Sequence, residues 1–212
     1  MIYSNAQLKR PPMLVLLLRQ RPLDIAAALA WALLAGFRLA AFLADPTPLQ
    51  GGIFIFNLLA AFLFLVRRPA AVQAPLKFFW LAAATTFLPT LVLRPTETGF
   101  RSTGIVIQSF GLGLMILTIA FLNRSFGIAP AHRGLVTSGP YRWMRHPLYA
   151  AEIVALTGYC LGYLSPGNGL AWLAIVTGQL LRIRAEENLL AQDSDYQIYQ
   201  ARVRWRLVPG VW

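Results

Sequence analysis

The sequence predicts an all-α integral membrane protein with five to six transmembrane helical segments, the last two forming a helical hairpin. Hydrophobic residues make up 57% of the 212 positions and charged residues only 13%, whereas soluble domains carry about 25% charged residues. Long uncharged runs recur along the chain, and its mean hydropathy is +0.56. The basic residues fall between these runs. A single compact bundle in a membrane explains all three observations.

Four apolar runs precede the hairpin, and each is near the ~20 residues that a helix needs to cross the hydrocarbon core. They cover residues 25–44, 49–66, 78–93 and 102–123. Arg38 interrupts the first run, and Pro89 lies in the third, where a membrane helix tolerates it better than a soluble one. We expect one membrane domain over 1–212, with N-terminal helices over 1–101 and a core that carries the polar motifs over 102–212.

The hairpin is predicted from 29 uncharged residues, 153–181, which are too many for one ordinary span. The sequence SPGNG at 165–169 lies in the middle, and serine, proline, asparagine and glycine are typical of turns. The second arm is expected to continue into water through 182–192.

The distribution of lysine and arginine predicts that the N-terminus and C-terminus lie in the cytoplasm, by the positive-inside rule. This orientation places sixteen basic residues on the cytoplasmic side and only Arg94 and Arg101 opposite. The sixteen are Lys9, Arg10, Arg19, Arg21, Arg67, Arg68, Lys77, Arg124, Arg133, Arg142, Arg145, Arg182, Arg184, Arg202, Arg204 and Arg206. The formal charge of +11 is therefore ascribed to lipid headgroups and not to nucleic acid. No cleavage site follows the short apolar run MLVLLL, so no removable signal peptide is expected.

The densest polar stretch is GPYRWMRHPLYAAE at 139–152, directly before the hairpin. Glu152 lies about one turn inside the apolar segment, where ionisable groups are costly and usually face a cavity or a partner. Two interpretations stay open for Glu152: it reaches to the membrane surface or pairs with an arginine, or it serves a site.

A second polar cluster, Arg182, Arg184, Glu186 and Glu187, follows the hairpin's return arm. A solvated helical face with ordinary i,i+4 pairs would have the same pattern. The alternative is that the hairpin brings this cluster beside Arg145–Tyr149 at one membrane surface. A pocket there would have carboxylates for a cation and arginines for an anion.

Three further features leave a structural and a functional interpretation open. The glycines of GLG, Gly111 and Gly113, are either helix-packing residues or part of a site. The alternation of arginine with Val203, Trp205 and Leu207 predicts an extended strip that lies on the membrane as an anchor or contributes to the site. With two histidines and the single Cys160, we expect no metal centre. We also find no nucleophile beside a base and no glycine-rich nucleotide loop.

The motifs LVTSGPYRWMRHPLY, RAEENLL, YQIYQARV and the final RLVPGVW resemble those of the isoprenylcysteine carboxyl methyltransferases and their bacterial relatives. The wider group includes the phospholipid N-methyltransferases. The resemblance covers residues 110–212, and the combination of RHPxY with EE behind a membrane hairpin is its specific part.

This resemblance implies a multi-pass enzyme that transfers a methyl group from S-adenosylmethionine, with S-adenosylhomocysteine as product, to a lipophilic acceptor. The cofactor site would lie near the cytoplasmic surface, which is that of the inner membrane if the source is bacterial. The residues it implies for the cofactor are Tyr141, Arg145, His146, Pro147, Tyr149, Glu186 and Glu187. In the phospholipid branch Gly111 and Gly113 would join them. The usual RHPxYxG has Ala151 in place of its glycine here, whose extra methyl could tighten the pocket.

The charges of the cofactor fit this assignment. Glu186 or Glu187 would hold the ammonium group of S-adenosylmethionine, and Arg145 or His146 its carboxylate. The catalytic set that we predict is Glu152, Arg145 and Arg182. An isoprenylcysteine-like carboxylate acceptor needs no base, whereas an amine or hydroxyl must lose a proton, for which Glu152 is the candidate. The acceptor would enter from the bilayer, and carboxyl O-methylation is the leading expectation.

Three alternatives remain at this stage. One is a phospholipid N-methyltransferase. Another is a sterol-type membrane reductase that uses a nicotinamide cofactor, for which the chain is short. The last is a non-catalytic scaffold or small transporter, which would leave the crowded motif without a purpose.

Overall fold

The computed structural model describes residues 13–129 and 131–212, with side chains from Gln20 onward. The predicted cytoplasmic positions Lys9 and Arg10 lie outside the described residues. Its helices are α1 (Met13–Ala44), α2 (Pro48–Val66), α3 (Leu76–Val92), α4 (Arg101–Leu122), α5 (Pro147–Gly162), α6 (Pro166–Leu190) and α7 (Ser194–Arg202), with 3₁₀ turns η1 (Asn123–Ser125) and η2 (Gly139–Arg142). Two short strands, β1 (Val72–Gln73) and β2 (Ala131–His132), complete it.

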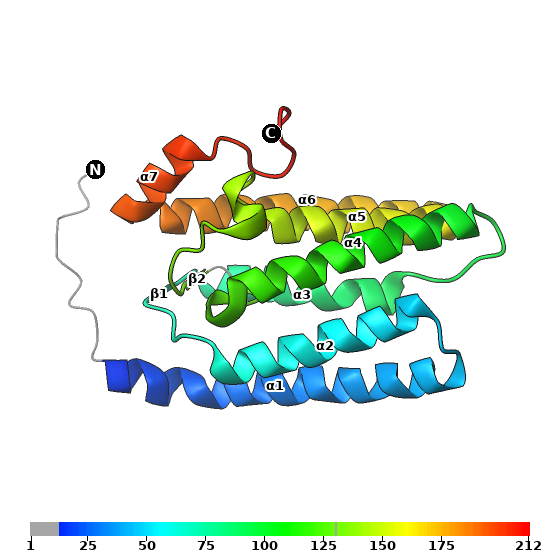
Figure 1. Ribbon diagram of the computed structural model, residues 1–212, viewed down its shortest axis with the longest axis horizontal. Helices are drawn as coiled ribbons and strands as arrows, with labels where there is room; N and C mark the ends of the chain where they lie inside the picture. Colours follow the sequence, from blue (N-terminus) through cyan, green and yellow to red (C-terminus); the bar gives the residue numbers. More distant parts are fainter. Residues whose placement is uncertain (1–12, 130) are drawn as a thin grey trace.

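The prediction of a helical membrane protein is confirmed, apart from the two-residue strands. Helices α1 to α6 run along one common axis (Figure 1). Within the described residues, three helical stretches are long and apolar enough to cross a membrane: Gln20–Ala44, Pro48–Val66 and Arg101–Ser125. Helix α3 is a shorter apolar helix. Large apolar side chains such as Leu29 and Phe37 are exposed on the outside of α1, as expected of a surface that contacts lipid.

The helical hairpin is confirmed, but its turn is not SPGNG. Helix α5 ends at Gly162, and Ser165 is already the N-cap of α6, with its hydroxyl accepting the Asn168 N–H at 3.0 Å. Pro166 takes the first helical position, where its missing N–H costs no hydrogen bond. The turn is therefore shorter than predicted, and the glycines belong to the first turn of α6.

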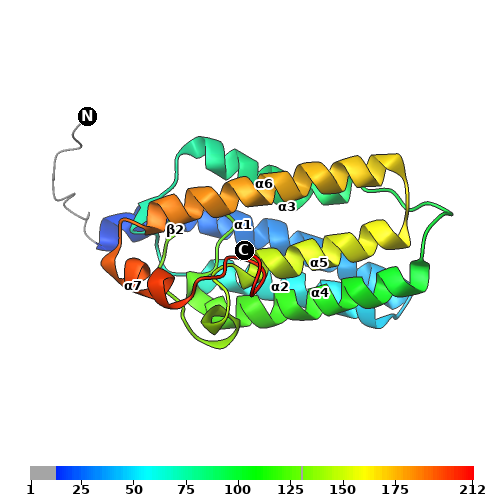
Figure 2. The same cartoon turned by 90° about the horizontal axis from the view of Figure 1, so that it is seen from above.

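Helices α5 and α6 are joined in sequence but pack mainly against different partners. Helix α5 lies along α4, and α6 lies along α3 (Figure 2). Glycines allow the close α4–α5 approach: a Cβ at Gly104 would fall 2.5 Å from the Cα of Gly162, and one at Gly158 would collide with the backbone of Gln108. Small residues of this kind let membrane helices approach closely. The hairpin is therefore splayed, which leaves room between its arms.

At one end of the bundle, the loop between α2 and α3 pairs with the loop that follows α4. Val72 lies opposite His132 and Gln73 opposite Ala131 in an antiparallel pair. From α1, the side-chain amide of Gln20 donates to the Ala70 carbonyl at 3.0 Å and accepts the Ala70 N–H at 2.7 Å. The N-terminal helices are thus tied to the segment that leads into the GPYRWMRHPLY motif.

The C-terminal segment consists of an unpredicted helix followed by a non-helical stretch that includes the predicted strip at 203–207. Residues Ser194–Arg202 form α7, capped by the carboxylate of Asp193, and the remaining residues fold back over the start of α5. The Arg145 N–H donates to the Trp205 carbonyl at 2.8 Å, and the His146 N–H to the Arg206 carbonyl at 2.9 Å. The segment covers the RHP motif and supplies acceptors for backbone N–H groups before α5 that have no partner within the helix.

Candidate functional site

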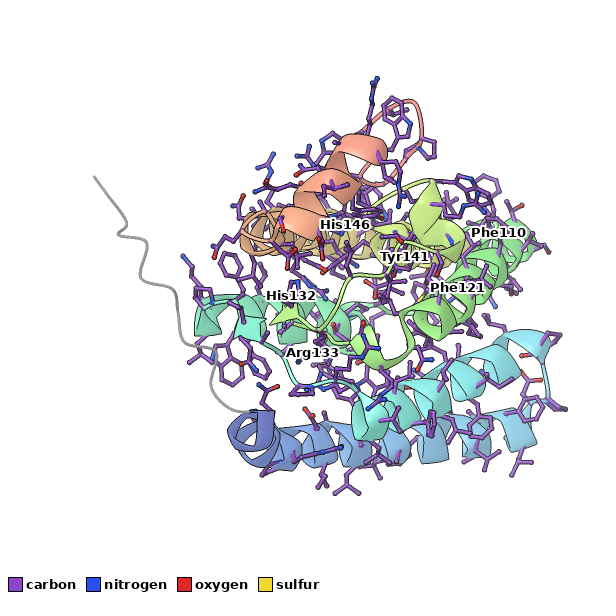
Figure 3. All side chains as sticks on the ribbon, turned by 60° about the vertical axis from the view of Figure 1, so that its left-hand side comes forward. Phe110, Phe121, His132, Arg133, Tyr141 and His146 are labelled. Carbon is purple, nitrogen blue, oxygen red and sulfur yellow. The ribbon has the colours of Figure 1, made fainter. Side chains whose placement is uncertain are left out.

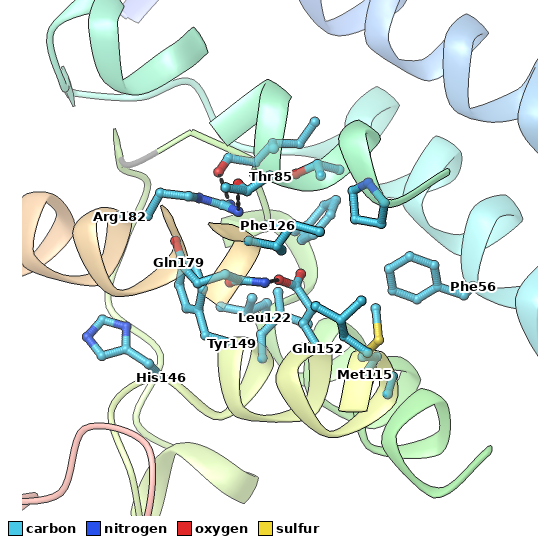
Figure 4. A pocket seen from close by; sticks show the side chains of 18 of the residues that line it. Phe56, Thr85, Met115, Leu122, Phe126, His146, Tyr149, Glu152, Gln179 and Arg182 are labelled. Carbon is cyan, nitrogen blue, oxygen red and sulfur yellow. Dashed lines mark hydrogen bonds between the residues drawn. The ribbon is translucent and has the colours of Figure 1, made fainter. Parts of the chain in front are cut away.

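A cavity of about 550 Å³ lies between the arms of the splayed hairpin and extends to α1 and α2. Its walls come from α1 to α6 and from the loop between α4 and β2. This volume lies within the ~300–1,000 Å³ typical of sites for small ligands. Figure 4 shows aliphatic and aromatic side chains such as Phe56, Met115 and Leu122 around a small number of polar groups.

Charged side chains of the RHPLY and EE motifs gather at one end of the cavity. Arg145, His146 and Tyr149 line it from the start of α5, and Glu186 lines it from α6. The Tyr149 hydroxyl donates to a carboxylate oxygen of Glu186 at 3.0 Å. Tyr141 lines the same end, and burial, together with the charge of Glu186, raises its pKa well above the usual 10.0. Its hydroxyl therefore stays protonated and is a hydrogen-bond donor. We refer to these five residues as the charged mouth.

Glu187 has a different position from Glu186, although the two are neighbours in sequence. Its Oε1 accepts from Arg145 Nε at 2.8 Å and lies 3.3 Å from His146 Nε2, and its Oε2 accepts from Arg206 Nε at 2.7 Å. Burial would raise the pKa of Glu187, but the hydrogen bonds from His146 and Arg206 and the charge of Arg145 lower it to about 2. Both oxygens are committed, so Glu187 joins α5, α6 and the C-terminal segment.

A second polar group lies deeper in the cavity. The Gln179 amide donates to the Glu152 carboxylate at 2.8 Å. Arg182 donates from Nη1 to the Thr85 hydroxyl at 2.8 Å and from Nη2 to the Ile128 carbonyl at 2.7 Å (Figure 4). Its guanidinium also lies 4.9 Å from the centre of the Tyr149 ring. The described residues provide no salt bridge between Arg182 and Glu152, so the pairing considered for Glu152 with an arginine is replaced by the Gln179 contact.

The structure therefore brings most of the predicted residues together. Tyr141, Arg145, His146, Tyr149, Glu152, Arg182 and Glu186 line one cavity. Pro147 is buried as the first residue of α5 and is outside the lining, as is Glu187.

The two glycines of GLG do not reach the cavity. A Cβ at Gly111 would collide with the backbone of Ala155 on α5, whereas nothing lies within 4 Å of one at Gly113, which is exposed. This geometry favours the packing interpretation for Gly111. Ala151 is 1% exposed and also outside the lining, so its methyl group does not narrow the cavity.

Sequence reasoning missed several polar residues of the lining, among them Gln179, Thr85 and Arg133. Gln179 could have been found, because it is a polar residue within an uncharged run and lies seven positions before Glu186 on the same side of α6. Thr85 gave no signal, since it lies in an ordinary apolar helix.

Residues 102–197 match the sequence model of a family described as phospholipid methyltransferase (PEMT). The match covers a little under half of the chain and includes the charged mouth, Glu152 and Arg182. No curated protein matches the chain significantly. The family match supports a membrane methyltransferase of the phospholipid or isoprenylcysteine type, and it favours this activity over the reductase and scaffold alternatives.

Proposed function

We propose that this chain is an integral membrane methyltransferase that transfers a methyl group from S-adenosylmethionine to a lipophilic acceptor. One observation carries the proposal: a single cavity begins among the charged residues of the two motifs and continues between apolar helices. A polar cofactor and a lipid need a shared space of this kind, with one polar and one apolar part.

The charged mouth fits the cofactor's groups. Glu186 uses one carboxylate oxygen for the Tyr149 hydroxyl, which leaves the other for the ammonium group or the ribose hydroxyls. Arg145 donates from Nε and Nη1 to Glu187 and the Val203 carbonyl, and its remaining N–H groups could hold the cofactor's carboxylate. His146 lines the same end as a second candidate. Glu187 is fully engaged, so we assign it to positioning Arg145 and His146 instead of binding the cofactor.

When bound, S-adenosylmethionine supplies an electrophilic methyl group on a sulfonium ion. The chain's own contribution would be to position the acceptor, to exclude water and to manage one proton. The C-terminal segment covers the RHP motif, and apolar side chains surround the deeper part of the cavity. The dry environment strengthens the electrostatic contacts of Glu186 and Arg145.

The position of Glu152 bears on the acceptor. One of its oxygens accepts from Gln179, so the other is left to face the cavity. A carboxylate there repels a carboxylate acceptor, but it attracts an ammonium group and accepts the proton that an amine or hydroxyl acceptor must lose. We therefore favour an amine or hydroxyl acceptor over the isoprenylcysteine-like carboxylate. The carboxylate acceptor remains the second candidate, because Arg182 has an unpaired buried Nε at the same depth.

The basic residues support a cytoplasmic position for the charged mouth. Arg68, Arg124, Arg142 and Arg204 lie on loops at the motif end of the bundle, whereas Arg94 and Arg101 lie at the opposite end. By the positive-inside rule the motif end faces the cytoplasm, where S-adenosylmethionine is available.

Isothermal titration on the purified chain in detergent tests the proposal. We expect micromolar binding of S-adenosylhomocysteine and no binding of a nicotinamide cofactor. Glu186→Gln should weaken the binding at least tenfold. The matched control is Glu97→Gln, which changes an exposed acid at the opposite end and should leave binding intact. Absence of binding to the wild-type chain would refute the proposal.

The acceptor assignment has a separate test. Lipids extracted from membranes and incubated with the enzyme and a heavy-methyl donor reveal the acceptor by mass spectrometry. Glu152→Gln should lower turnover about 100-fold for an amine or hydroxyl acceptor while the affinity for S-adenosylhomocysteine stays unchanged. Turnover that is unchanged or increased would support the carboxylate acceptor instead.

A further inference from the structure

Arg133 is a cavity-lining arginine for which the described part of the chain provides no hydrogen-bond acceptor at Nε or Nη1. The residue is only 8% exposed, and both of these atoms are fully buried. The Arg145 side chain, by contrast, donates to Glu187 and the Val203 carbonyl, and Arg182 donates from both Nη atoms and leaves only its Nε unpaired. Leaving buried donors of a charged group unpaired is costly. A ligand that supplies acceptor atoms for these donors would remove the cost.

The surrounding backbone holds Arg133 in place. It directly follows β2, which pairs with β1, and its carbonyl accepts from the Ser125 hydroxyl at 3.3 Å. A Cβ at Gly127 would lie 3.2 Å from Arg133 Nε and 3.3 Å from Arg67 Nη1. A side chain at position 127 would therefore crowd the two guanidinium groups, and glycine leaves this space to them. The site is therefore built, and it is not a side chain that happens to lie on a surface.

The charge around Arg133 is positive. Arg67 donates from Nε to the buried carboxylate of Asp24 at 2.9 Å, so Asp24 already neutralises one of the two guanidinium groups. Burial, followed by the charge of Arg67, lowers the pKa of Arg133 to about 10, although Asp24 opposes the shift. Arg133 is therefore still cationic at neutral pH, and its charge favours an anion as the partner of its free N–H groups.

The position of Arg133 separates it from the charged mouth. In Figure 3, Arg133 lies on the side of its loop toward α1 and α2, whereas His146 and Tyr141 lie toward α5 and α6. Between them, the Ile128 carbonyl from the Arg133 loop accepts from Arg182. An anion on Arg133 is thus on the opposite wall from the residues assigned to the cofactor, and it shares the cavity with Glu152 and the apolar lining.

We infer that Arg133 binds an anionic oxygen group of the lipid acceptor, so that the acceptor is an acidic or zwitterionic amphiphile anchored by this group while its chain lies in the apolar part of the cavity. This inference rests on the proposed function, because the bound lipid is a methyl acceptor only if the chain is a methyltransferase. A phosphate or a carboxylate supplies the required chemistry, because both accept two parallel N–H bonds from a guanidinium fork.

Matched lipids test the inference on the full chain in neutral detergent. The probes are dioctanoyl phosphatidic acid and dioctanoyl glycerol, which differ only in the phosphate. Wild type should bind the phosphatidic acid at least tenfold more tightly, and Arg133→Gln should remove this preference. Arg133→Lys should keep part of it, since a lysine keeps the charge without the fork. Arg68→Gln is the control, because it removes an exposed arginine next to Gly134, outside the cavity lining.

Two further readouts separate the inference from its alternatives. The affinity for S-adenosylhomocysteine should be the same in Arg133→Gln as in wild type, and the melting temperature without ligand should not fall. A retained preference for phosphatidic acid in Arg133→Gln would overturn the inference. Tenfold weaker binding of S-adenosylhomocysteine would overturn it too, by assigning the anion to the cofactor, and a marked fall in melting temperature would do so by assigning Arg133 a structural role. Failure of wild type to bind S-adenosylhomocysteine concerns only the proposed function.

Discussion

Replacing Glu187 by glutamine should detach the C-terminal segment from the RHP motif. Glu187 is 6% exposed, and its carboxylate receives hydrogen bonds from two arginines and a histidine. Glutamine has nearly the same shape but removes the charge that balances Arg145 and Arg206. It also places an amide N–H where only acceptors are useful.

The magnitude follows from the exposure of the two arginines. The Arg145 side chain is 5% exposed, and breaking a buried pair by removing one partner costs about 3–5 kcal/mol. The Arg206 side chain is 34% exposed, so its share is at most about 1 kcal/mol. The total is dominated by Arg145 and corresponds to a fall in melting temperature on the order of 10 °C.

The assay is a thermal melt in detergent, combined with hydrogen exchange of the Arg145 and His146 amides and of residues 203–212. We expect faster exchange of the Arg145 and His146 amides, which donate to this segment. Because the pKa of Glu187 is lowered from 4.5 to about 2, its contribution to stability is fully present above pH 4.5 and is lost as the pH falls toward 2. Wild type should therefore lose more stability than the glutamine variant over that interval. A variant with unchanged melting and unchanged exchange at pH 7 would refute the reasoning.

Three further predictions concern the packing that shapes the site. Gly158→Val should lower the melting temperature strongly, because the new side chain would collide with the backbone of Gln108, whereas Gly113→Ala has open space and serves as the control. Tyr199→Phe should lower the free energy of unfolding by about 1–3 kcal/mol, measured by the same melts, because the Tyr199 hydroxyl donates to the Tyr141 carbonyl at 2.7 Å. The affinity for the cofactor should fall less than the stability, since Tyr199 is outside the cavity lining. Asp193→Asn should loosen α7 without abolishing binding of S-adenosylhomocysteine, because Asp193 caps α7 and pairs with His132 at 2.9 Å; proteolysis near α7 is the measurement, and an unchanged cleavage rate would contradict it.

The sequence alone was enough to predict α2 to α6 and the meeting of the two polar motifs, but α1 begins twelve residues before the predicted run and α7 was not predicted. Apolar run length determines where helices cross a membrane, so α2, α3 and α4 begin and end within a few residues of the predicted runs. The predicted position of the hairpin turn was wrong because Ser165 and Pro166 were interpreted as turn residues. Serine followed by proline is equally a helix start, and here that is the role they have.

The distinct roles of Glu186 and Glu187 could not be predicted from the sequence. Adjacent residues on a helix point about 100° apart, so only one of the pair can face the cavity, and which one depends on the rotation of α6. That rotation is set by contacts such as Arg182 with Thr85, which are 97 positions apart. The docking of the C-terminal segment could not be predicted for a similar reason, because it depends on backbone donors of the RHP motif far from it in sequence.

The contacts of α1 to α3 have a consequence for any fragment of this chain. A fragment restricted to the family-matching residues 102–197 would lose β1, the strand partner of His132, and Thr85, which accepts from Arg182. It would also lose the wall that Phe56 and Thr85 contribute to the cavity. The N-terminal helices therefore supply part of the structure of the site. Exchanging them between relatives should alter the site even where every motif residue is kept.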